Sequence, residues 1–243
     1  MILLASQSGR VLIIAHGGAF SPFLANTAEG IGESIAADVD GIEVDVQATR
    51  DGELVLLHDS SLRMGRERIK VSDRSFAELA AIFEKRERRR LPRLREVLDR
   101  LHGKPSLLVL DIKAGNVIDR VMRLLHAADA AATTLIASFD YLPLVRAKEL
   151  QPRVPTGVTV GLSRVMTRPL GFLWTLFALF SPVRAALRID ADAILCPAYR
   201  LTRRLVRRAH AREIAVLVWD LGARNREDLA TYRIDGVVTN SLA

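Results

Sequence analysis

The sequence predicts a single α/β domain, a (β/α)8 barrel of the TIM type with a small insertion after the second strand. Short runs rich in leucine and β-branched residues alternate with segments of helical pattern along nearly the whole chain, and parallel strands need such crossovers. The 243 residues are a normal length for one such barrel, so residues 1–243 are expected to form one domain. The sequence contains no linker, low-complexity segment or internal repeat that would divide it.

Each of eight apolar runs has the length and composition of a buried strand. A further run, 54–57, follows the second strand too closely for a helical crossover. Because it comes after Asp51-Gly52, a strong hairpin signal, it is expected to return antiparallel. With the turn centred on those two residues, His58 is predicted to lie opposite Asp45, and a slip of one residue would place them on opposite faces. The eight predicted barrel strands are 11–15, 41–46, 107–112, 135–138, 156–160, 193–195, 215–219 and 236–239.

The longest stretch between barrel strands is the insertion at 60–103. It contains helical patterns at 75–83 and 94–101. Long connections of this kind often carry function. We expect the insertion to form a small cap beside the mouth of the barrel.

The chain is basic, with a formal net charge of +7. A positive field favours an anionic partner, a class that includes acidic lipids and phosphate esters. The run 200–212 places Leu201, Leu205 and Ala209 at a four-residue spacing between arginines, which is typical of an amphipathic helix, either a solvated outer helix or a binding face. The arginine runs lack interleaved aromatic residues and match no nucleic-acid-binding module, so nucleic acid is not an expected partner.

The segment 168–187 combines aromatic and aliphatic residues with arginines at both ends. Its uncharged run, 169–183, is too short to span a bilayer, which needs about 20 residues. Two interpretations stay open. The segment is either a helix in the interface of an anionic membrane, with Trp174 and Phe177 inserting, or a buried or dimer-contact helix.

Cys196 is the only cysteine, so neither a disulfide framework nor a cysteine-based metal cluster is expected. The N-terminus lacks the charged start, continuous apolar stretch and cleavage site of a signal peptide. The sequence therefore predicts a cytoplasmic protein. In the membrane-interface interpretation the protein is peripheral on the inner membrane face. Oligomerisation stays open.

The second predicted strand carries two carboxylates on one face. Glu43 and Asp45 are two residues apart, so their side chains leave the strand in the same direction. Such carboxylates repel each other unless a cation or a proton intervenes. Oxygen ligands suit a hard divalent cation such as Mg²⁺ or Ca²⁺.

The third predicted strand repeats this arrangement, since Asp111 and Lys113 follow an apolar run and share one face. An Asp-x-Lys pair of this kind is usually an ion pair on the protein surface. At the end of a barrel strand, however, the pair would supply a third metal ligand and a cation for a phosphate group.

Ionisable side chains thus follow four of the apolar runs. In TIM barrels the carboxyl ends of the strands meet at one face, which carries the active site. Two histidines beside a metal-held phosphate suit phosphodiester cleavage, because one removes a proton from the attacking oxygen and the other protonates the leaving alcohol. The remaining histidines, His102, His126 and His210, have polar helical surroundings and are interpreted as surface residues. The converging residues are His16, Glu43, Asp45, His58, Asp111 and Lys113.

These residues stand in motifs that resemble the glycerophosphodiester phosphodiesterase family: "AHGG" with "NT" downstream, "GIEVDVQATRDGELVLLHD" at 41–59, and "LDIK". The stretch 41–59 is the specific part, and "SFD", "VLVWDLG" and "DGVVTN" extend the likeness to the end of the chain. The resemblance implies a TIM barrel that hydrolyses glycerophosphodiesters to glycerol 3-phosphate and an alcohol. In that family a glycerol hydroxyl is thought to attack the phosphorus before water completes hydrolysis.

The resemblance also implies roles for single residues. His16 and His58 would be the acid–base pair, and Lys113 would contact the phosphate. Trp219 matches an aromatic residue near the glycerol site. The implied ligands of the divalent cation are Glu43, Asp45 and Asp111.

The chain departs from the family pattern at four of these positions. A phosphate-binding arginine is replaced by Gly17, a glutamate by Ala25, a glutamate by the shorter Asp111, and a late aspartate by Asn240. Loss of a bidentate arginine removes a strong charge-assisted contact to phosphate.

Two hypotheses follow from the resemblance and the departures. The first is an active metal-dependent phosphodiesterase in which Arg50 or Lys113 substitutes for the lost arginine. Its basic surface and segment 168–187 then favour a lipid-derived substrate, such as a lysophospholipid or phospholipid, at an anionic membrane surface. The second is a catalytically weak or inactive homologue that binds phosphodiesters or lipids.

Overall fold

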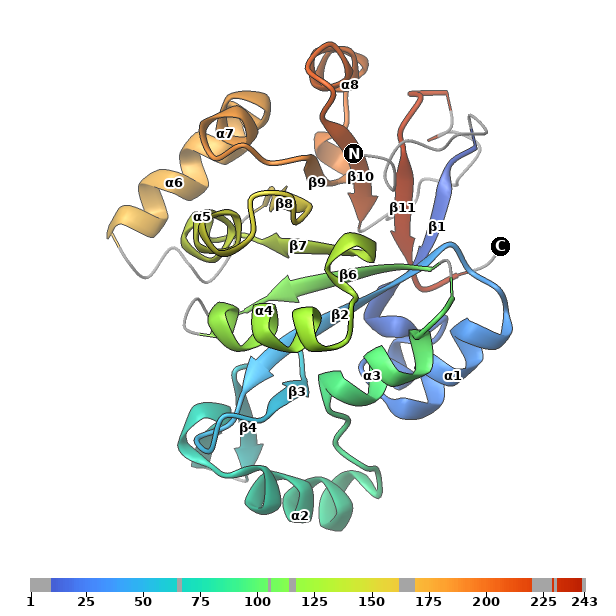
Figure 1. Ribbon diagram of the computed structural model, residues 1–243, viewed down its shortest axis with the longest axis vertical. Coiled ribbons are helices and arrows are strands. Elements are labelled where there is room, and N and C mark those ends of the chain that lie inside the picture. Colours follow the sequence, from blue (N-terminus) through green and yellow to red (C-terminus); the bar gives the residue numbers. More distant parts are fainter. Residues whose placement is uncertain are drawn as a thin grey trace.

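The structure is a computed structural model that describes residues 10–64, 67–104, 106–113, 117–161, 169–219, 229 and 231–241. Within these residues, eight parallel strands close into a barrel with helices around it (Figure 1), which confirms the predicted TIM fold. The barrel closes because β1 pairs with both β2 and β11. In chain order the barrel strands are β1 (Leu12–Ala15), β2 (Gly41–Ala48), β6 (Leu107–Ile112), β7 (Thr134–Ser138), β8 (Thr156–Thr159), β9 (Ala193–Pro197), β10 (Ala215–Trp219) and β11 (Gly236–Thr239).

Helices cover the outer side of the barrel. The helix after β1 begins at an N-cap, because the side-chain oxygen of Thr27 accepts the backbone N–H of Gly30. The helix after β9 is amphipathic as predicted, with Val206 and Ala209 buried and its arginines outside. The helices are α1 (Ala28–Ala36), α2 (Phe76–Glu87), α3 (Leu94–Leu101), α4 (Ile118–Ala127), α5 (Tyr141–Leu150), α6 (Pro169–Phe180), α7 (Pro182–Arg188) and α8 (Arg203–His210). Short 3-10 turns are η1 (His16–Gly18), η2 (Pro22–Leu24), η3 (Val71–Asp73), η5 (Ala131–Thr133) and η7 (Ala198–Arg200).

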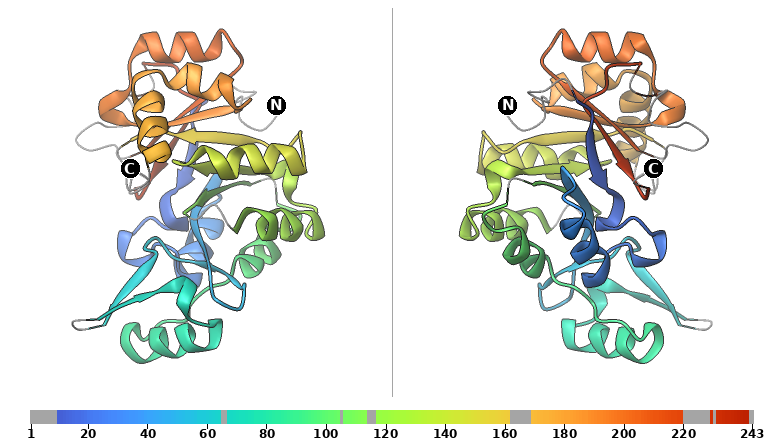
Figure 2. Two further views of the ribbon diagram at one scale, coloured as in Figure 1. Left: turned by 90° about the vertical axis from the view of Figure 1, so that its left-hand side faces the viewer. Right: turned by 90° about the vertical axis from the view of Figure 1, so that its right-hand side faces the viewer.

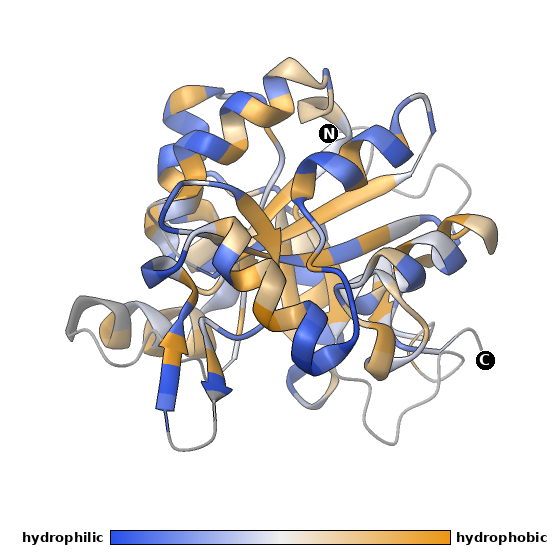
Figure 3. Cartoon of the chain, turned by 90° about the horizontal axis from the view of Figure 1, so that it is seen from below, coloured by the Kyte–Doolittle hydropathy of each residue, from blue (hydrophilic) through white to orange (hydrophobic). Residues whose placement is uncertain are grey.

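Alternation along the strands produces two apolar layers. Residues such as Val44 and Val216 point outward and pack against the helices. Residues such as Ile14, Val109 and Leu217 point inward and fill the barrel. In Figure 3 the barrel strands in the middle of the molecule are mainly hydrophobic, as this double packing requires.

The inward alternation also positions polar side chains. Two residues beyond Ile14 the same face carries His16, and two beyond Val109 it carries Asp111. Asp45 is the register partner of Asp111 on the neighbouring strand. The barrel therefore has an apolar interior that changes to polar at the carboxyl ends of the strands.

The hairpin after β2 has a different register from the predicted one. β3 (Leu54–Leu56) is antiparallel to β2 as expected, but Val46 pairs with Leu56, so the predicted pairing of His58 with Asp45 is wrong by one residue. The backbone N–H of Thr49 bonds to the carbonyl of Glu53 at 3.0 Å, which leaves three loop residues rather than two. Gly52 is the last of the three and has a φ of 89°, the usual position of glycine in such a loop.

The insertion projects from one end of the barrel. It consists of the antiparallel hairpin of β4 (Ser61–Met64) and β5 (Glu67–Lys70), followed by α2, and all three views place these elements together below the barrel (Figure 2). A small separate core joins Val71, Leu79 and Leu91 of the insertion to Val55 of β3. The second helical pattern in this stretch forms α3, which packs into the main core rather than into the insertion.

The apolar segment forms α6 and α7, and α6 has one buried and one exposed side. Trp174 is buried and its ring lies 4.9 Å from that of Tyr141. For this residue the buried-helix interpretation holds, and the alternative in which Trp174 inserts into a membrane is wrong. Leu173 and Phe180 are 62% and 74% exposed. None of the helices in the described part of the chain is long and apolar enough to cross a bilayer.

Candidate active site

Three carboxylates gather at the carboxyl ends of β2 and β6. Each of Glu43, Asp45 and Asp111 offers an oxygen that lies within 4.8 Å of the others'. All three side chains are buried. Their convergence follows from the strand register, which places Asp45 beside Asp111 with Glu43 one inward position earlier on β2.

The donor set fits a hard divalent cation. The oxygen Oδ1 of Asp111 is buried and has no hydrogen-bond partner among the described residues. Leaving a buried carboxylate oxygen without a partner is costly, so such an atom needs a ligand. Mg²⁺ and Ca²⁺ prefer oxygen donors, and this set consists of carboxylate oxygens. The orphan oxygen and the donor set together indicate a metal site.

The electrostatics of the cluster reflect its burial. Burial, with the nearby charges of Asp45 and Asp111, raises the pKa of Glu43 well above its ordinary value. Burial also raises the pKa of Asp111, although Lys113 opposes the rise. For Asp45 burial acts in the same direction, but Lys113 and other neighbours outweigh it and lower the pKa. A nearby positive charge therefore lowers the pKa of Asp45, while the pKa values of Glu43 and Asp111 stay raised.

Lys113 supplies that positive charge within the cluster. Its Nζ lies 2.7 Å from Oδ1 of Asp45 and 2.5 Å from Oδ2 of Asp111. Burial alone would lower the pKa of Lys113, but the two aspartates outweigh it and raise the pKa. The ammonium is therefore charged and joins the two aspartates.

His16 follows β1 and lies at the edge of the cluster. Its Nε2 is 3.9 Å from Oε2 of Glu43, and its Nδ1 is 2.8 Å from Oδ1 of Asn240. The imidazole is about half exposed, so one side is open to a substrate. The structure thus brings His16 to the three carboxylates, as the sequence predicted.

His58 lies on the returning arm of the hairpin, beyond the end of β3. Although its pairing differs from the predicted one, the chain at Leu57 still donates its N–H to the carbonyl of Asp45 at 3.0 Å. Burial and Lys113 act most strongly on the pKa values of Asp45 and Asp111, and His58 adds a further lowering to both. Its imidazole is therefore within electrostatic range of the cluster.

Trp219 ends β10 on the opposite side of the barrel mouth. Its ring packs edge-on against Phe139, with centroids 6.1 Å apart and planes at 84°. A Cβ at Gly161 would lie 3.2 Å from atoms of both rings, so glycine leaves room for this packing. The pair forms an apolar wall at the end of the barrel.

Arg50 is not placed with the cluster. It lies in the hairpin loop, where its guanidinium donates to Oε2 of Glu78 at 2.9 Å and to the carbonyl of Asp73 at 3.1 Å. Both partners belong to the insertion. In this structure Arg50 therefore fastens the insertion to the hairpin.

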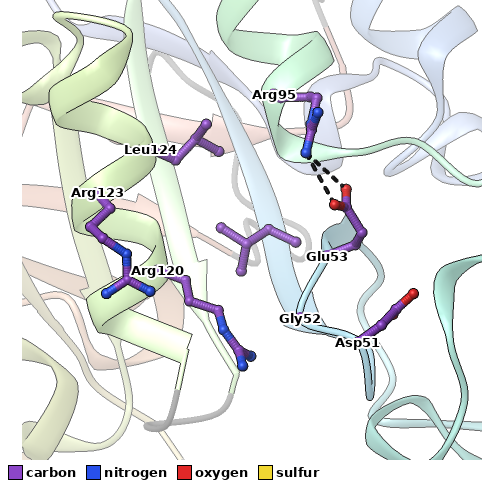
Figure 4. A pocket seen from close by; sticks show the side chains of 8 residues that line it. Asp51, Gly52, Glu53, Arg95, Arg120, Arg123 and Leu124 are labelled. Carbon is purple, nitrogen blue, oxygen red and sulfur yellow. Dashed lines mark hydrogen bonds and ion pairs between the residues drawn. The ribbon is translucent and has the colours of Figure 1, made fainter.

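A cavity of about 400 Å³ lies between the same hairpin loop and α4 (Figure 4). Arg95, Arg120 and Arg123 line it, and both carboxylate oxygens of Glu53 accept from Arg95, at 3.1 and 3.2 Å. The guanidinium of Arg120 lies over Gly52. The carboxylates and histidines described above are not among the residues that line this cavity.

Two asparagines support the site without having been predicted to do so. Asn26 makes two hydrogen bonds to Asp45: its Nδ2 donates to Oδ2 at 2.7 Å, and its Oδ1 accepts the backbone N–H of Asp45 at 2.9 Å. Asn240 contacts His16 in a similar way. The position of Asn240, two residues beyond the inward Val238 of β11, is a sequence signal that could have identified it.

The comparisons with known proteins agree with this geometry. The sequence profile of the Glycerophosphoryl diester phosphodiesterase family matches residues 16–243. A glycerophosphodiester phosphodiesterase from Caldanaerobacter subterraneus subsp. tengcongensis is 24% identical over 244 residues, covering 95% of this chain and 94% of that protein. A lysophospholipase D from Mus musculus is 23% identical over 261 residues, covering 95% of this chain and 79% of that protein.

A solved structure shows the same fold. The crystal structure of a Silicibacter pomeroyi protein, named as a glycerophosphoryl diester phosphodiesterase, superposes with a TM-score of 0.82 at 23% sequence identity. The match covers 98% of this chain and 92% of that chain. The barrel and its insertion are therefore an architecture that other proteins share.

Proposed function

The chain belongs to the glycerophosphoryl diester phosphodiesterase family and is a hydrolase of that family, and from this premise we propose how its own residues act and which substrates it prefers. One observation carries the proposal. Three buried carboxylates and Lys113 gather at the carboxyl end of a TIM barrel, with His16 beside Glu43 and His58 within electrostatic range, at the face where such barrels have their active sites.

His16 and His58 move the protons of the reaction. One imidazole accepts the proton of the attacking hydroxyl as its oxygen forms a bond to phosphorus. The other donates a proton to the oxygen of the leaving alcohol as the phosphorus–oxygen bond breaks. Lys113 binds a non-bridging phosphate oxygen and offsets the negative charge that grows there.

Glu43, Asp45 and Asp111 are the proposed ligands of a divalent cation, Mg²⁺ or Ca²⁺. When bound, such an ion supplies positive charge that stabilises the developing charge on the phosphate. Asn26 keeps Asp45 in position for this role through its two hydrogen bonds. Trp219 is proposed to contact the glycerol part of the substrate.

The activity is tested on purified protein with glycerophosphocholine, glycerophosphoethanolamine and lysophosphatidylcholine. Each is incubated with Mg²⁺, Ca²⁺ or a chelator, and release of glycerol phosphate or of a phosphomonoester is measured. We expect metal-dependent turnover of at least one substrate. Turnover that is unaffected by the chelator would remove the proposed role of the carboxylates.

We further propose that the substrate is lipid-derived and is met at an anionic membrane surface. The exposed side of α6 carries Leu173 and Phe180, and the exposed Arg184 and Arg188 follow on α7. Apolar side chains beside arginines suit an interface of anionic head groups. The similarity to a lysophospholipase D supports the same substrate class.

The position of α6 also supports this proposal. Trp174 packs on Tyr141, which comes just after the carboxyl end of β7, and Arg200, just after β9, donates to the carbonyl of Leu179 at 2.5 Å. Both contacts hold α6 on the side toward which β6 and β7 point in Figure 1. The helix that carries the exposed apolar side chains therefore lies on the side of the barrel mouth.

Membrane binding is tested by sedimentation with vesicles of phosphatidylcholine alone or mixed with phosphatidylglycerol. We expect the protein to bind the anionic vesicles and Leu173→Asp with Phe180→Asp to abolish binding while glycerophosphocholine turnover is retained. Leu150→Asp, which changes an exposed leucine at the end of α5, is the matched control. Vesicle binding that survives the double substitution contradicts the proposal. The proposal is also contradicted if the wild-type protein is a dimer and the double substitution makes it a monomer, because α6 is then a dimer contact.

A further inference from the structure

The amide of Asn240 has one orientation that satisfies its surroundings. Its Nδ2 donates to the backbone carbonyl of His16 at 3.1 Å and to that of Ala19 at 3.3 Å. Carbonyl oxygens only accept, so the nitrogen of the amide must face them. The amide oxygen Oδ1 is therefore the atom that faces the imidazole of His16.

This orientation selects one tautomer of His16. Oδ1 of Asn240 lies 2.8 Å from Nδ1 of His16, a normal hydrogen-bond distance. An amide oxygen has no proton to give, so Nδ1 carries the hydrogen. In the neutral imidazole Nε2 then has a free lone pair. That atom is the one on the side of the acidic cluster, 3.9 Å from Oε2 of Glu43.

We propose that Asn240 is a positioning residue that holds a proton of His16 on Nδ1, so that Nε2 is the atom through which His16 exchanges a proton with the substrate. The assignment rests on the proposed function. In the neutral form of His16, Nε2 can take the proton of the attacking hydroxyl, whose oxygen forms the bond to phosphorus, while the second histidine, His58, gives its proton to the departing alcohol oxygen.

An asparagine suits this position better than an aspartate for orientation. A carboxylate also accepts from Nδ1, but it cannot donate to the two carbonyls that fix the amide of Asn240. The other histidine pairs in the described residues use carboxylates, as in His210 with Asp235 at 2.9 Å and His58 with Asp59 at 3.3 Å. His16 alone among these has a neutral partner that is itself held by the backbone.

The test measures the tautomer directly, by ¹⁵N nuclear magnetic resonance of the imidazole nitrogens in the full chain. In the wild-type protein we expect Nδ1 of His16 to be protonated and Nε2 to be unprotonated. Asn240→Ala should shift His16 toward the Nε2–H form. Its kcat should fall about 10–100-fold with little change in KM, the usual effect of removing a residue that orients a reacting group. The exposed His126 serves as the internal reference.

Asn240→Asp is the rescue variant, because it keeps an acceptor for Nδ1. We expect it to retain the tautomer and to recover most of the kcat lost in Asn240→Ala. A wild-type His16 protonated at Nε2 overturns the proposal, as does an Asn240→Ala protein with unchanged tautomer or kcat. If no diester is hydrolysed, the proposed function fails, and with it the catalytic role of Nε2. A tautomer that still follows Asn240 then leaves the positioning role intact.

Discussion

The two halves of the barrel differ at the carboxyl ends of their strands. In the half formed by β11, β1, β2 and β6, the inward side chains are charged or polar and contact one another. In the half formed by β7 to β10, the described inward side chains carry no charge. The first set is Asn240, His16, Glu43, Asp45, Asp111 and Lys113, and the second is Phe139, Thr159, Gly161, Pro197 and Trp219.

This difference separates two tasks. The charged half holds ionised groups at fixed distances, and Lys113 joins two of its carboxylates. The uncharged half presents an apolar wall in which Trp219 and Phe139 pack on each other. We expect the rate of the chemical step to depend on the first half and the preference among substrates on the second.

The largest effect should come from removing a proton-transfer group in the charged half. His16→Gln should lower kcat about 10²–10⁴-fold, the range typical of a lost acid–base group. His126→Gln on α4, an exposed histidine away from the cluster, should leave kcat unchanged. Steady-state kinetics on the best substrate of the panel measure both. Equal losses in the two variants would contradict the division between the halves.

Metal binding should stabilise the charged half and depend on Glu43. At 100-fold the Kd, Mg²⁺ or Ca²⁺ should add about 2.7 kcal/mol to the free energy of unfolding. Glu43→Gln should lose most of this gain. Thermal unfolding with and without chelator measures it, and a gain that is the same in both proteins would exclude Glu43 as a ligand.

The pH dependence of the metal-free protein gives a second check. Because burial, Asp45 and Asp111 raise the pKa of Glu43, its ionisation opposes folding. Stability should therefore fall as the pH rises from the ordinary carboxyl range through the raised pKa. Glu43→Gln should lack this fall and have the higher Tm above it. A steeper fall in the variant would contradict the assigned direction.

A change in the uncharged half should affect substrate preference instead. Trp219→Ala removes a large apolar side chain, a loss of about 1.5–3 kcal/mol of burial, or about 10–100-fold in kcat/KM. We expect the effect mainly in KM, and Trp219→Phe should recover part of it. A loss confined to kcat would show that Trp219 acts in the chemical step and would remove the contrast between the halves.

The barrel strands and the acidic cluster were predictable because their signals are local. Two-residue alternation after an apolar run places Glu43 with Asp45 and Asp111 with Lys113 whatever the rest of the fold does. The register of the hairpin was not predictable, since it depends on whether the loop has two or three residues. The side of α6 that is buried was not either, because a helix apolar nearly all round gives no amphipathic signal.

The contact of Asn240 with His16 joins residues that are 224 positions apart. It exists only because β11 closes the barrel beside β1, so the alternation that places Asn240 on the inward face does not show that His16 is its partner. The two hydrogen bonds between Asn26 and Asp45 likewise depend on the fold, because they join a loop to a strand. Residues that act by orienting other residues can therefore be identified in this site only from the folded structure.

The smallest effect concerns Gly17, where the chain departs from its family. Its N–H donates to Oε2 of Glu43 at 2.9 Å, and its φ of 61° is costly for other residues. A Cβ there would lie 2.6 Å from the Cβ of Ala25. The two departures at these positions are thus in contact, and an arginine restored at Gly17 alone meets both obstacles.

Gly17→Arg and Gly17→Ala should each lower stability by about 1–2 kcal/mol for the backbone, or about 2–8 °C in Tm, with the contact adding to it. Gly103→Ala is the matched control, because φ there is 72° and nothing lies within 4 Å of the added Cβ. The difference between Gly17→Ala and Gly103→Ala therefore measures the contact alone, and Ala25→Gly should remove that difference. If Gly17→Ala is no less stable than Gly103→Ala, the loop moves to accommodate the added Cβ without loss of stability. The glycine then does not fix the N–H that holds Glu43, and the charged half is less rigid than the distances imply.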